Sequence, residues 1–405
     1  MATSDMITIP QSAEDIALSW VQQVLQRDLP DVIITDVDVK GSISQGEGFL
    51  SDIVAFDAVG TKDGTSHRYS LVAKLTDFKR PQTLMPDFPK DFHMQLDILE
   101  VKFYSILVPD LLYDVSVQST ERKFQPKGAH CGGYSHADSL FLPKCYYAAT
   151  DPSSMVSVRV MENLKTQGFS IKPNLQPLSR DEMMLTAGAF AQLHGLSHRL
   201  ELHLGKPLPE KYGWIRPDAI SPNEQATEAF TNEFHKCLKK FAAAFPDQTD
   251  LVARLEKRIR NLKTLFDVTK DPRVKVLSHG DCWGNNIMIK YEGDVPVAAK
   301  LVDWQGIKFH PPTYDLVHLF LCGTDWDVFH SHRDAILAHY HQKLQETLNP
   351  SESSGLQKYT LEQLNADFKA DCLYGVCCRI MMLLVLPADQ DLLRKVQEIK
   401  EWGVL

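Results

Sequence analysis

The chain has 405 residues, and its 43 Lys and Arg against 52 Asp and Glu give a formal net charge of −9. With 44% hydrophobic and 23% charged residues, the composition excludes a disordered chain, a collagen-like chain and a small disulfide scaffold. The length favours two packed units, and the negative charge argues against a nucleic-acid-binding protein, which needs a basic face.

Targeting signals and zinc-type cysteine motifs are weak in this sequence. The N-terminus lacks a basic segment followed by a long apolar run, and the most apolar stretch, 380–386, is far shorter than the ~20 residues that span a bilayer. The eight cysteines show no paired C-x-x-C spacing of the zinc type, and the adjacent Cys377 and Cys378 lie in an apolar helical run. We therefore expect a cytoplasmic protein with reduced thiols and no membrane insertion.

The first 163 residues predict a small α+β unit built on antiparallel strands. The expected elements are a helix at 11–29, strands at 32–34, 37–39, 49–59 and 69–75, a helix at 92–107, and strands at 145–149 and 155–161. Asp63 and Gly64 lie between two of these strands and are a hairpin-turn signal. The polar segment 118–140 is expected to be a long loop or a loose hairpin.

The remaining residues, 164–405, predict a mainly helical unit. Expected helices cover 180–199, one or two stretches of 222–268, and then 325–347, 361–386 and 388–402. Between them lies a segment, 274–310, with short β-prone pieces at 274–277, 286–291 and 298–302. This segment also has the highest density of polar functional groups in the chain, so we expect it to contain catalytic residues.

Three polar residues of that segment have the spacing that phosphoryl transfer requires. Asn286 follows Asp281 by five residues, and Asp303 follows Asp281 by 22 residues at the end of an apolar strand. This separation allows a strand out, a turn and a strand back, which places the three side chains at one end of a hairpin. In phosphoryl transfer a carboxylate accepts the proton of the attacking hydroxyl, while Asp and Asn oxygens hold magnesium.

The first unit offers residues of the kind that bind phosphate. Lys74 ends an apolar strand, and Glu100 lies in the following helix, where a glutamate can orient the lysine through an ion pair. Gly46 and Gly48 form a glycine-bearing turn ahead of Lys74, and glycine lets backbone amides approach phosphate oxygens closely. The order of these features along the chain is that of the kinase fold.

Two motifs of this sequence resemble those of a known family. The residues His-Gly-Asp-Cys-Trp-Gly-Asn-Asn at 279–286 and Val-Asp-Trp-Gln at 302–305 look like motifs of the CHK-kinase-like, or ecdysteroid-kinase-like, group. That group belongs with the choline kinases and aminoglycoside phosphotransferases. Further similarity lies at 141–147, 160–164, 191–194 and 312–316. The resemblance implies a bilobal protein-kinase-like fold with a small antiparallel-sheet lobe, 1–163, and a large helical lobe, 164–405.

The resemblance also implies roles for individual residues. Asp281 would be the catalytic base, and Asn286 and Asp303 would be the Mg²⁺ ligands. Lys74 and Glu100 would be the phosphate-binding pair. The hinge residues whose backbone would meet the adenine of ATP are Met161, Glu162 and Asn163.

Two positions depart from the family pattern. Trp304 stands where many relatives have Phe, and Asn163 stands where Asp is common. Two further residues are expected to support the loop: His279 by hydrogen bonding, and Asp315 from the segment after a Pro-Pro turn.

The implied reaction is ATP-dependent phosphorylation of a hydroxyl on a small molecule. A steroid alcohol such as an ecdysteroid, or a xenobiotic alcohol, is the leading acceptor class, and choline-like amines are the runner-up. Three other interpretations stay open: a catalytically silent nucleotide-binding relative, a magnesium-dependent phosphohydrolase, and a protein kinase. The last is disfavoured because the segment between Asp303 and Asp315 is too short for an activation loop.

Overall fold

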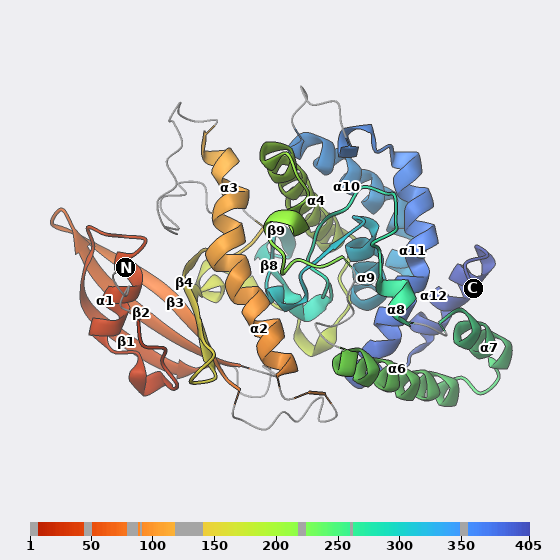
Figure 1. The fold of residues 1–405 in the computed structure, drawn as a ribbon, viewed down its shortest axis with the longest axis horizontal. Coiled ribbons are helices and arrows are strands. Elements are labelled where there is room, and N and C mark those ends of the chain that lie inside the picture. Colours follow the sequence, from red (N-terminus) through yellow and green to blue (C-terminus); the bar gives the residue numbers. More distant parts are fainter. Residues whose placement is uncertain are drawn as a thin grey trace. The chain divides into compact units, whose positions relative to one another are not determined.

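The computed structural model describes residues 7–43, 51–78, 88–89, 91–117, 141–217, 224–259, 262–348 and 355–405. The chain divides into two compact units (Figure 1). The first comprises Met1–Pro86 and Lys90–Gly168, and the second comprises Asp87–Pro89 and Phe169–Leu405. Each unit has its own sheets and helices.

The first unit is built on an antiparallel sheet whose described strands follow the order β1-β2-β3-β5-β4. These strands are β1 (Ile33–Ser42), β2 (Asp52–Lys62), β3 (Thr65–Asp77), β4 (Cys145–Asp151) and β5 (Val156–Glu162). The turn between β2 and β3 is the predicted one, with φ of 51° at Asp63 and 77° at Gly64. Positive φ at both central residues matches the twist of the flanking strands, so the Asp-Gly pair fixes this hairpin.

One face of this sheet packs on α1 (Leu18–Gln26). Trp20 and Val24 of the helix join Val54 and Phe56 of β2 in a single buried apolar cluster. The predicted helix 11–29 is shorter than expected. Ser12 and Asp15 close a 3-10 turn through a capping box, and α1 begins only after the extended Ala17.

A helical segment longer than predicted lies between β3 and β4. It runs without a break through α2 (Phe92–Lys102), a π-helical turn at Phe103–Leu107 and α3 (Val108–Val117). The expectation of an end at residue 107 is therefore wrong. Pro109 lies within this segment, two residues after the π-helical turn, and the wider turn leaves space between its ring and the preceding carbonyl groups.

The second unit is mainly helical. Its described α-helices are α4 (Arg180–Leu204), α5 (Leu208–Lys211), α6 (Glu224–Ala244), α7 (Thr249–Arg258), α8 (Leu262–Phe266), α9 (Thr313–Gly323), α10 (Arg333–Thr347), α11 (Leu361–Met381) and α12 (Gln390–Glu401). Helix α10 packs on α4, and α11 packs on α9. The latter pair is close because Gly375 has no side chain: a Cβ there would lie 2.8 Å from the carbonyl oxygen of Val317.

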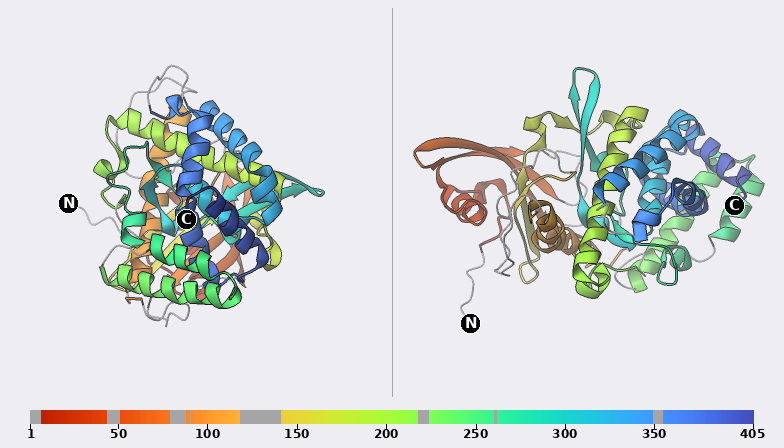
Figure 2. Two further views of the ribbon diagram at one scale, coloured as in Figure 1. Left: turned by 90° about the vertical axis from the view of Figure 1, so that its right-hand side faces the viewer. Right: turned by 90° about the horizontal axis from the view of Figure 1, so that it is seen from above.

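Short strands of the second unit carry the polar segment that the sequence singled out. β6 (Phe169–Ser170), β8 (Ile287–Glu292) and β9 (Val295–Leu301) form one small sheet, and β7 (Val276–Ser278) pairs with β10 (Lys308–His310). The β8–β9 hairpin projects from the helices of this unit, as the right-hand view of Figure 2 shows. The predicted strand–turn–strand between Asn286 and Asp303 is therefore present.

The α+β class with an antiparallel sheet in the first unit and mostly helices in the second is confirmed. The stretch 222–268 was expected to hold one or two helices but contains α6, α7 and α8. Pro246 explains one break, because the residue before a proline is disfavoured in helical geometry. Among the described helices, none combines the length and apolar character that a bilayer crossing needs.

Candidate active site

In the first unit, the predicted lysine and glutamate are in contact. Lys74 lies on β3 and Glu100 on α2, and Lys74 Nζ donates to Glu100 Oε2 at 2.7 Å. Their side chains are 10% and 1% exposed, respectively. A buried charge is tolerated only when an opposite charge or hydrogen bonds compensate for lost hydration, so each side chain depends on the other.

An arginine that the sequence reasoning missed joins this pair. Arg159 of β5 is fully buried, and its Nη1 donates to Asp97 Oδ1 at 2.6 Å while its Nη2 lies 3.1 Å from Glu100 Oε2. Arg159 is the cross-strand partner of Lys74, and both side chains meet carboxylates of α2. The sequence carried no signal for this burial, because Val158, Arg159 and Val160 alternate as they do in a strand with one solvated face.

The predicted hinge lies at the end of β5. The backbone amide of Glu162 donates to Lys144 O, and that of Asn163 donates to Ser70 O, both at 2.9 Å. The Asn163 side chain accepts from Lys165 N and caps a short 3-10 helix. These two amides are used inside the unit, so an adenine ring would have to meet other backbone groups of this segment. Gly46 and Gly48 lie outside the described residues.

In the second unit, Asp281 and Asn286 are directly hydrogen-bonded. Asn286 Nδ2 donates to Asp281 Oδ2 at 2.7 Å and to the Asp281 carbonyl oxygen at 2.9 Å. The loop begins where β7 ends, and Asn286 stands just before β8. Val302, next to Asp303, donates its amide to Asn286 O at 3.0 Å, which ties the end of β9 to the same place.

The charges of Asp281 and Asp303 act on each other. Burial raises the pKa of Asp281, and the negative charge of Asp303 raises this pKa further. Two carboxylates in electrostatic contact favour a cation between them. Asp303 also has a φ of 66°, a left-handed conformation that costs a non-glycine residue roughly 1–2 kcal/mol. Such strain persists only where the surrounding structure holds it, and it is frequent at functional sites.

Two glycines let the loop of Asp281 and the turn after Asp303 touch through their backbones. A Cβ on Gly280, whose φ is 76°, would lie 2.0 Å from the carbonyl oxygen of Gly306. A Cβ on Gly306 would in turn lie 2.9 Å from the carbonyl oxygen of His279. Neither position has room for a side chain, so this contact is a direct cause of the arrangement of Asp281 and Asp303.

His279 holds the loop by hydrogen bonds, in line with the role expected for it. Its Nε2 lies 3.0 Å from the Val302 carbonyl oxygen, and the amide of Asp281 donates to its Nδ1 at 3.3 Å. An Nε2 proton donated to the carbonyl and an unprotonated Nδ1 satisfy both contacts. The ring also packs against Trp304, with ring centres 4.6 Å apart. The tryptophan that replaces phenylalanine thus keeps an aromatic partner for His279.

Asp315, near the start of α9, is the acceptor that fixes the loop. It is 1% exposed and accepts from the amides of His279 at 2.8 Å and Gly280 at 3.0 Å, and from Cys282 Sγ at 3.0 Å. His194 Nε2 of α4 lies 3.1 Å from the same carboxylate. Burial alone raises the pKa of Asp315, but His194 and the other donors lower this pKa more, so the carboxylate stays ionised.

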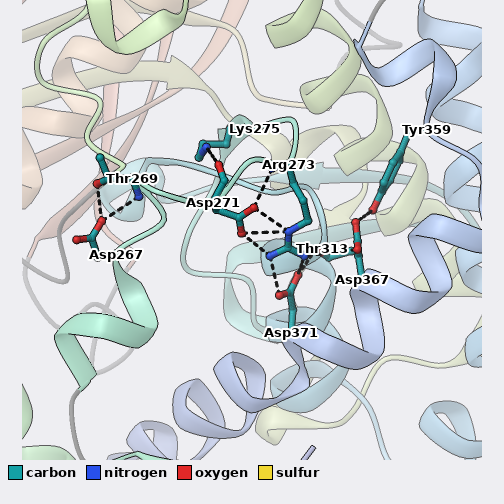
Figure 3. A network of polar contacts seen from close by, with 9 residues as sticks. All are labelled: Asp267, Thr269, Asp271, Arg273, Lys275, Thr313, Tyr359, Asp367 and Asp371. Carbon is teal, nitrogen blue, oxygen red and sulfur yellow. Dashed lines mark hydrogen bonds and ion pairs between the residues drawn. The ribbon is translucent and has the colours of Figure 1, made fainter.

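A second polar network anchors the chain that enters β7 (Figure 3). The Arg273 guanidinium pairs with Asp271 at 2.6 Å and with Asp371 of α11 at 2.8 Å. Asp371 also accepts from the hydroxyl of Thr313, the first residue of α9. The network therefore joins the approach to β7, the start of α9 and the middle of α11, and α9 carries Asp315.

The chain matches one known protein family over most of its length. The model of the ecdysteroid kinase-like family matches residues 45–352, more than half of the chain. No protein in the search of curated proteins matches.

Solved structures show only remote likeness. The choline kinase LicA from Streptococcus pneumoniae is 13% identical with a TM-score of 0.38, over 95% of this chain and 97% of that one. A Plasmodium vivax ethanolamine kinase is 12% identical with a TM-score of 0.35, over 93% and 83%. The GDP complex of wild-type aminoglycoside 2'-phosphotransferase-IIIa is 14% identical with a TM-score of 0.33, over 96% and 98%. The family match is the finding that places the protein: this chain belongs to the ecdysteroid kinase-like family.

Proposed function

We propose that this protein is an ATP- and Mg²⁺-dependent kinase that phosphorylates a hydroxyl group of a small molecule. The observation that carries the proposal is the hydrogen bond between Asn286 and Asp281, next to the charge of Asp303, in a chain of this family. Residues 1–163 would bind the nucleotide through Lys74 and the hinge. Residues 164–405 would supply the catalytic loop.

Asp281 would act as the catalytic base. Its carboxylate would accept the proton of the acceptor hydroxyl as the hydroxyl oxygen forms a bond to the γ-phosphorus and the bond from that phosphorus to ADP breaks. The hydrogen bond from Asn286 fixes the direction of this carboxylate.

Asn286 and Asp303 would hold the metal. Both offer hard oxygen ligands, and because Asn286 Nδ2 is directed at Asp281, its Oδ1 is the atom left to meet a cation. No group of three His, Cys, Asp or Glu side chains in the described ranges is placed to hold a metal, so the remaining ligands would be phosphate and water oxygens. Bound magnesium neutralises charge on the phosphates.

Lys74 would bind phosphate oxygens, with Glu100 directing its ammonium group. Gly46 and Gly48 would bring backbone amides close to the phosphates. The adenine would lie along Met161, Glu162 and Asn163 and use backbone groups other than the amides of Glu162 and Asn163, which donate to Lys144 and Ser70. For the acceptor, the family supports an ecdysteroid-like steroid alcohol or a xenobiotic alcohol, with choline-like amines as the alternative.

The test combines binding with transfer. Wild-type protein should gain thermal stability with Mg²⁺ and ATP, and a mass-spectrometric screen of hydroxylated steroids, xenobiotic alcohols, choline and ethanolamine should show one acceptor gaining a phosphate. Asp281→Asn should lose at least about 100-fold in kcat, the scale of general-base catalysis, while its ATP-dependent stabilisation persists.

The possible failures have different meanings. Absence of any nucleotide-induced stabilisation of the wild type contradicts the kinase proposal. Binding without transfer to any acceptor, with ATP left intact, supports the silent nucleotide-binding alternative. Unchanged turnover in Asp281→Asn contradicts the assignment of the base. Asp181→Asn is the matched control, because this aspartate is exposed on α4 and should leave both readouts unchanged.

A further inference from the structure

Four buried charged side chains form one cluster in the first unit: Lys74, Asp97, Glu100 and Arg159. None of these side chains is more than 10% exposed. Glu100 Oε2 is shared by two cations, since Lys74 Nζ lies 2.7 Å and Arg159 Nη2 lies 3.1 Å from it. The cluster contains two positive and two negative groups, so its formal charge is zero.

Arg159 is held in this place independently of Lys74. Its Nη1 donates to Asp97 Oδ1 at 2.6 Å and to Ser157 Oγ at 2.7 Å. Thr76 Oγ1 donates to the same Asp97 oxygen at 3.0 Å. An arginine stays protonated at any pH at which the protein is folded, so this contact supplies a permanent positive charge beside Glu100.

The shared oxygen determines how strongly Glu100 neutralises Lys74. Because the Glu100 carboxylate is also paired with Arg159, it neutralises the Lys74 ammonium less completely, and the positive potential at Lys74 is higher. A charge removed at Arg159 would leave the cluster at −1, and one removed at Asp97 would leave it at +1. Because the site is buried, this difference is weakly screened and is felt by an anion that Lys74 binds.

We propose that Arg159 and Asp97 are a charge-balancing pair that positions Glu100 and sets the affinity of Lys74 for nucleotide phosphate. Arg159 is a positioning residue in this scheme, since it acts through Glu100. The inference rests on the proposed function, because the consequence that it predicts is a change in ATP binding. The effect of Arg159 and Asp97 on the electrostatic potential at Lys74 does not depend on that function.

The first experiment measures the Kd of Mg·ATP by calorimetry for Arg159→Gln, Asp97→Asn and the double variant. Arg159→Gln should weaken binding roughly tenfold, and Asp97→Asn should tighten it, because the two changes shift the local charge in opposite directions. The double variant is neutral again and should return close to the wild-type Kd. Arg159→Lys keeps the charge and should also bind nearly as the wild type does.

A merely structural role gives a different pattern. Both single variants would then weaken ATP binding in step with their loss of thermal stability, and the double variant would be the weakest. That outcome overturns the proposal. Arg68→Gln is the matched control, since Arg68 lies on β3 with a side chain 67% exposed and should not change the Kd.

The second experiment needs no nucleotide. Only a neutral amine reacts with an acylating reagent, so the labelling rate of Lys74 at fixed pH, followed by peptide mass spectrometry, reports its electrostatic surroundings. Arg159→Gln should slow labelling and Asp97→Asn should accelerate it, each by several-fold. Equal effects of the two variants refute the charge-balancing pair. If the wild type binds no ATP, the proposed function fails, while this labelling result still decides the inference.

Discussion

Gly280 is the residue on which the geometry of the proposed catalytic loop depends most directly. It combines a φ of 76° with backbone contact to Gly306, so it meets two requirements that only glycine satisfies together. The adjacent Asp281 cannot keep its position relative to Asp303 if this contact opens. The two glycines are therefore as much a part of the candidate site as the carboxylates are.

We predict that Gly280→Ala lowers stability and activity together. The methyl group would meet a carbonyl oxygen at 2.0 Å, and such overpacking costs about 1–3 kcal/mol beyond the ~1–2 kcal/mol of left-handed strain. Gly293→Ala is the control, because Gly293 also has positive φ, 62°, but open space around its Cβ position. Urea unfolding should show a clearly larger loss for Gly280→Ala. Equal losses of unfolding free energy in the two variants would mean that the backbone contact between Gly280 and Gly306 does not contribute to stability.

At the scale of elements, α9 links the candidate site to the rest of the second unit. Asp315 in its first turn receives the loop amides, and Thr313 at its start donates to Asp371 of α11. Its other end meets Lys395 of α12, which is 2% exposed and donates to the carbonyl oxygens of Phe320 and Thr324. A cation at a helix C-terminus satisfies the last carbonyls and opposes the helix dipole.

Lys395 gives a pH-dependent prediction. Burial lowers the pKa of Lys395 to about 8, from an ordinary value near 10.5. Between these values the unfolded state binds more protons than the folded state, so the free energy of unfolding rises with pH. Relative to Lys395→Met, the wild type should therefore gain up to ~3 kcal/mol between pH 8 and pH 10.5 in chemical unfolding.

The same comparison at pH 7 tests the cap itself. Removing the ammonium leaves buried carbonyl oxygens without their donor, so Lys395→Met should lose about 1–3 kcal/mol there. Lys343→Met, at an exposed position of α10, should lose less than ~1 kcal/mol. A stability difference between wild type and Lys395→Met that stays constant across pH would contradict the buried, proton-releasing lysine.

At the scale of the whole molecule, the thiols report on folding across the chain. Of the cysteines in the described residues, one is buried in the first unit, five are buried in the second, and Cys322 is half-buried. Burial raises the pKa of the thiols of Cys282, Cys377 and Cys378, which keeps them in the unreactive protonated form. The adjacent pair Cys377 and Cys378, which the sequence places in an apolar helical run, packs in the core.

We predict that these six buried thiols become reactive only on unfolding. A colorimetric thiol assay should count at least six more groups in guanidinium chloride than in the native protein, without prior reduction. The rates should differ by orders of magnitude, because a buried thiol reacts only after local or global opening. Rapid reaction of these thiols in the native protein would contradict the packed cores of both units.

The local sequence pattern correctly predicted those elements for which one signal, such as alternation of apolar residues or a turn dipeptide, dominates. Alternating apolar residues predicted the strands around Lys74, and the Asp63-Gly64 pair predicted the hairpin turn. Element ends were less accurate where two local signals compete. Ser12 with Asp15 closed a separate turn before α1, and the helical segment continued past Pro109 because a π-helical turn precedes it.

The sequence by itself determined the α+β composition and the grouping of Asp281 with Asn286, because spacing along a strand, helix or hairpin dictates which side chains meet. The pairing of Lys74 with Glu100 was expected from the order of these residues along the chain, and the packing of α2 on the sheet brings them into contact. Only the tertiary structure decided the place of Arg159. Arg159 and Asp97 are 62 positions apart, and no periodicity links them. Burial of many distant residues fixes the sheet register, which sets Arg159 beside Lys74, and it also fixes the packing of α2 on that sheet. Four charges that are separate in the sequence therefore form one buried cluster with a formal charge of zero.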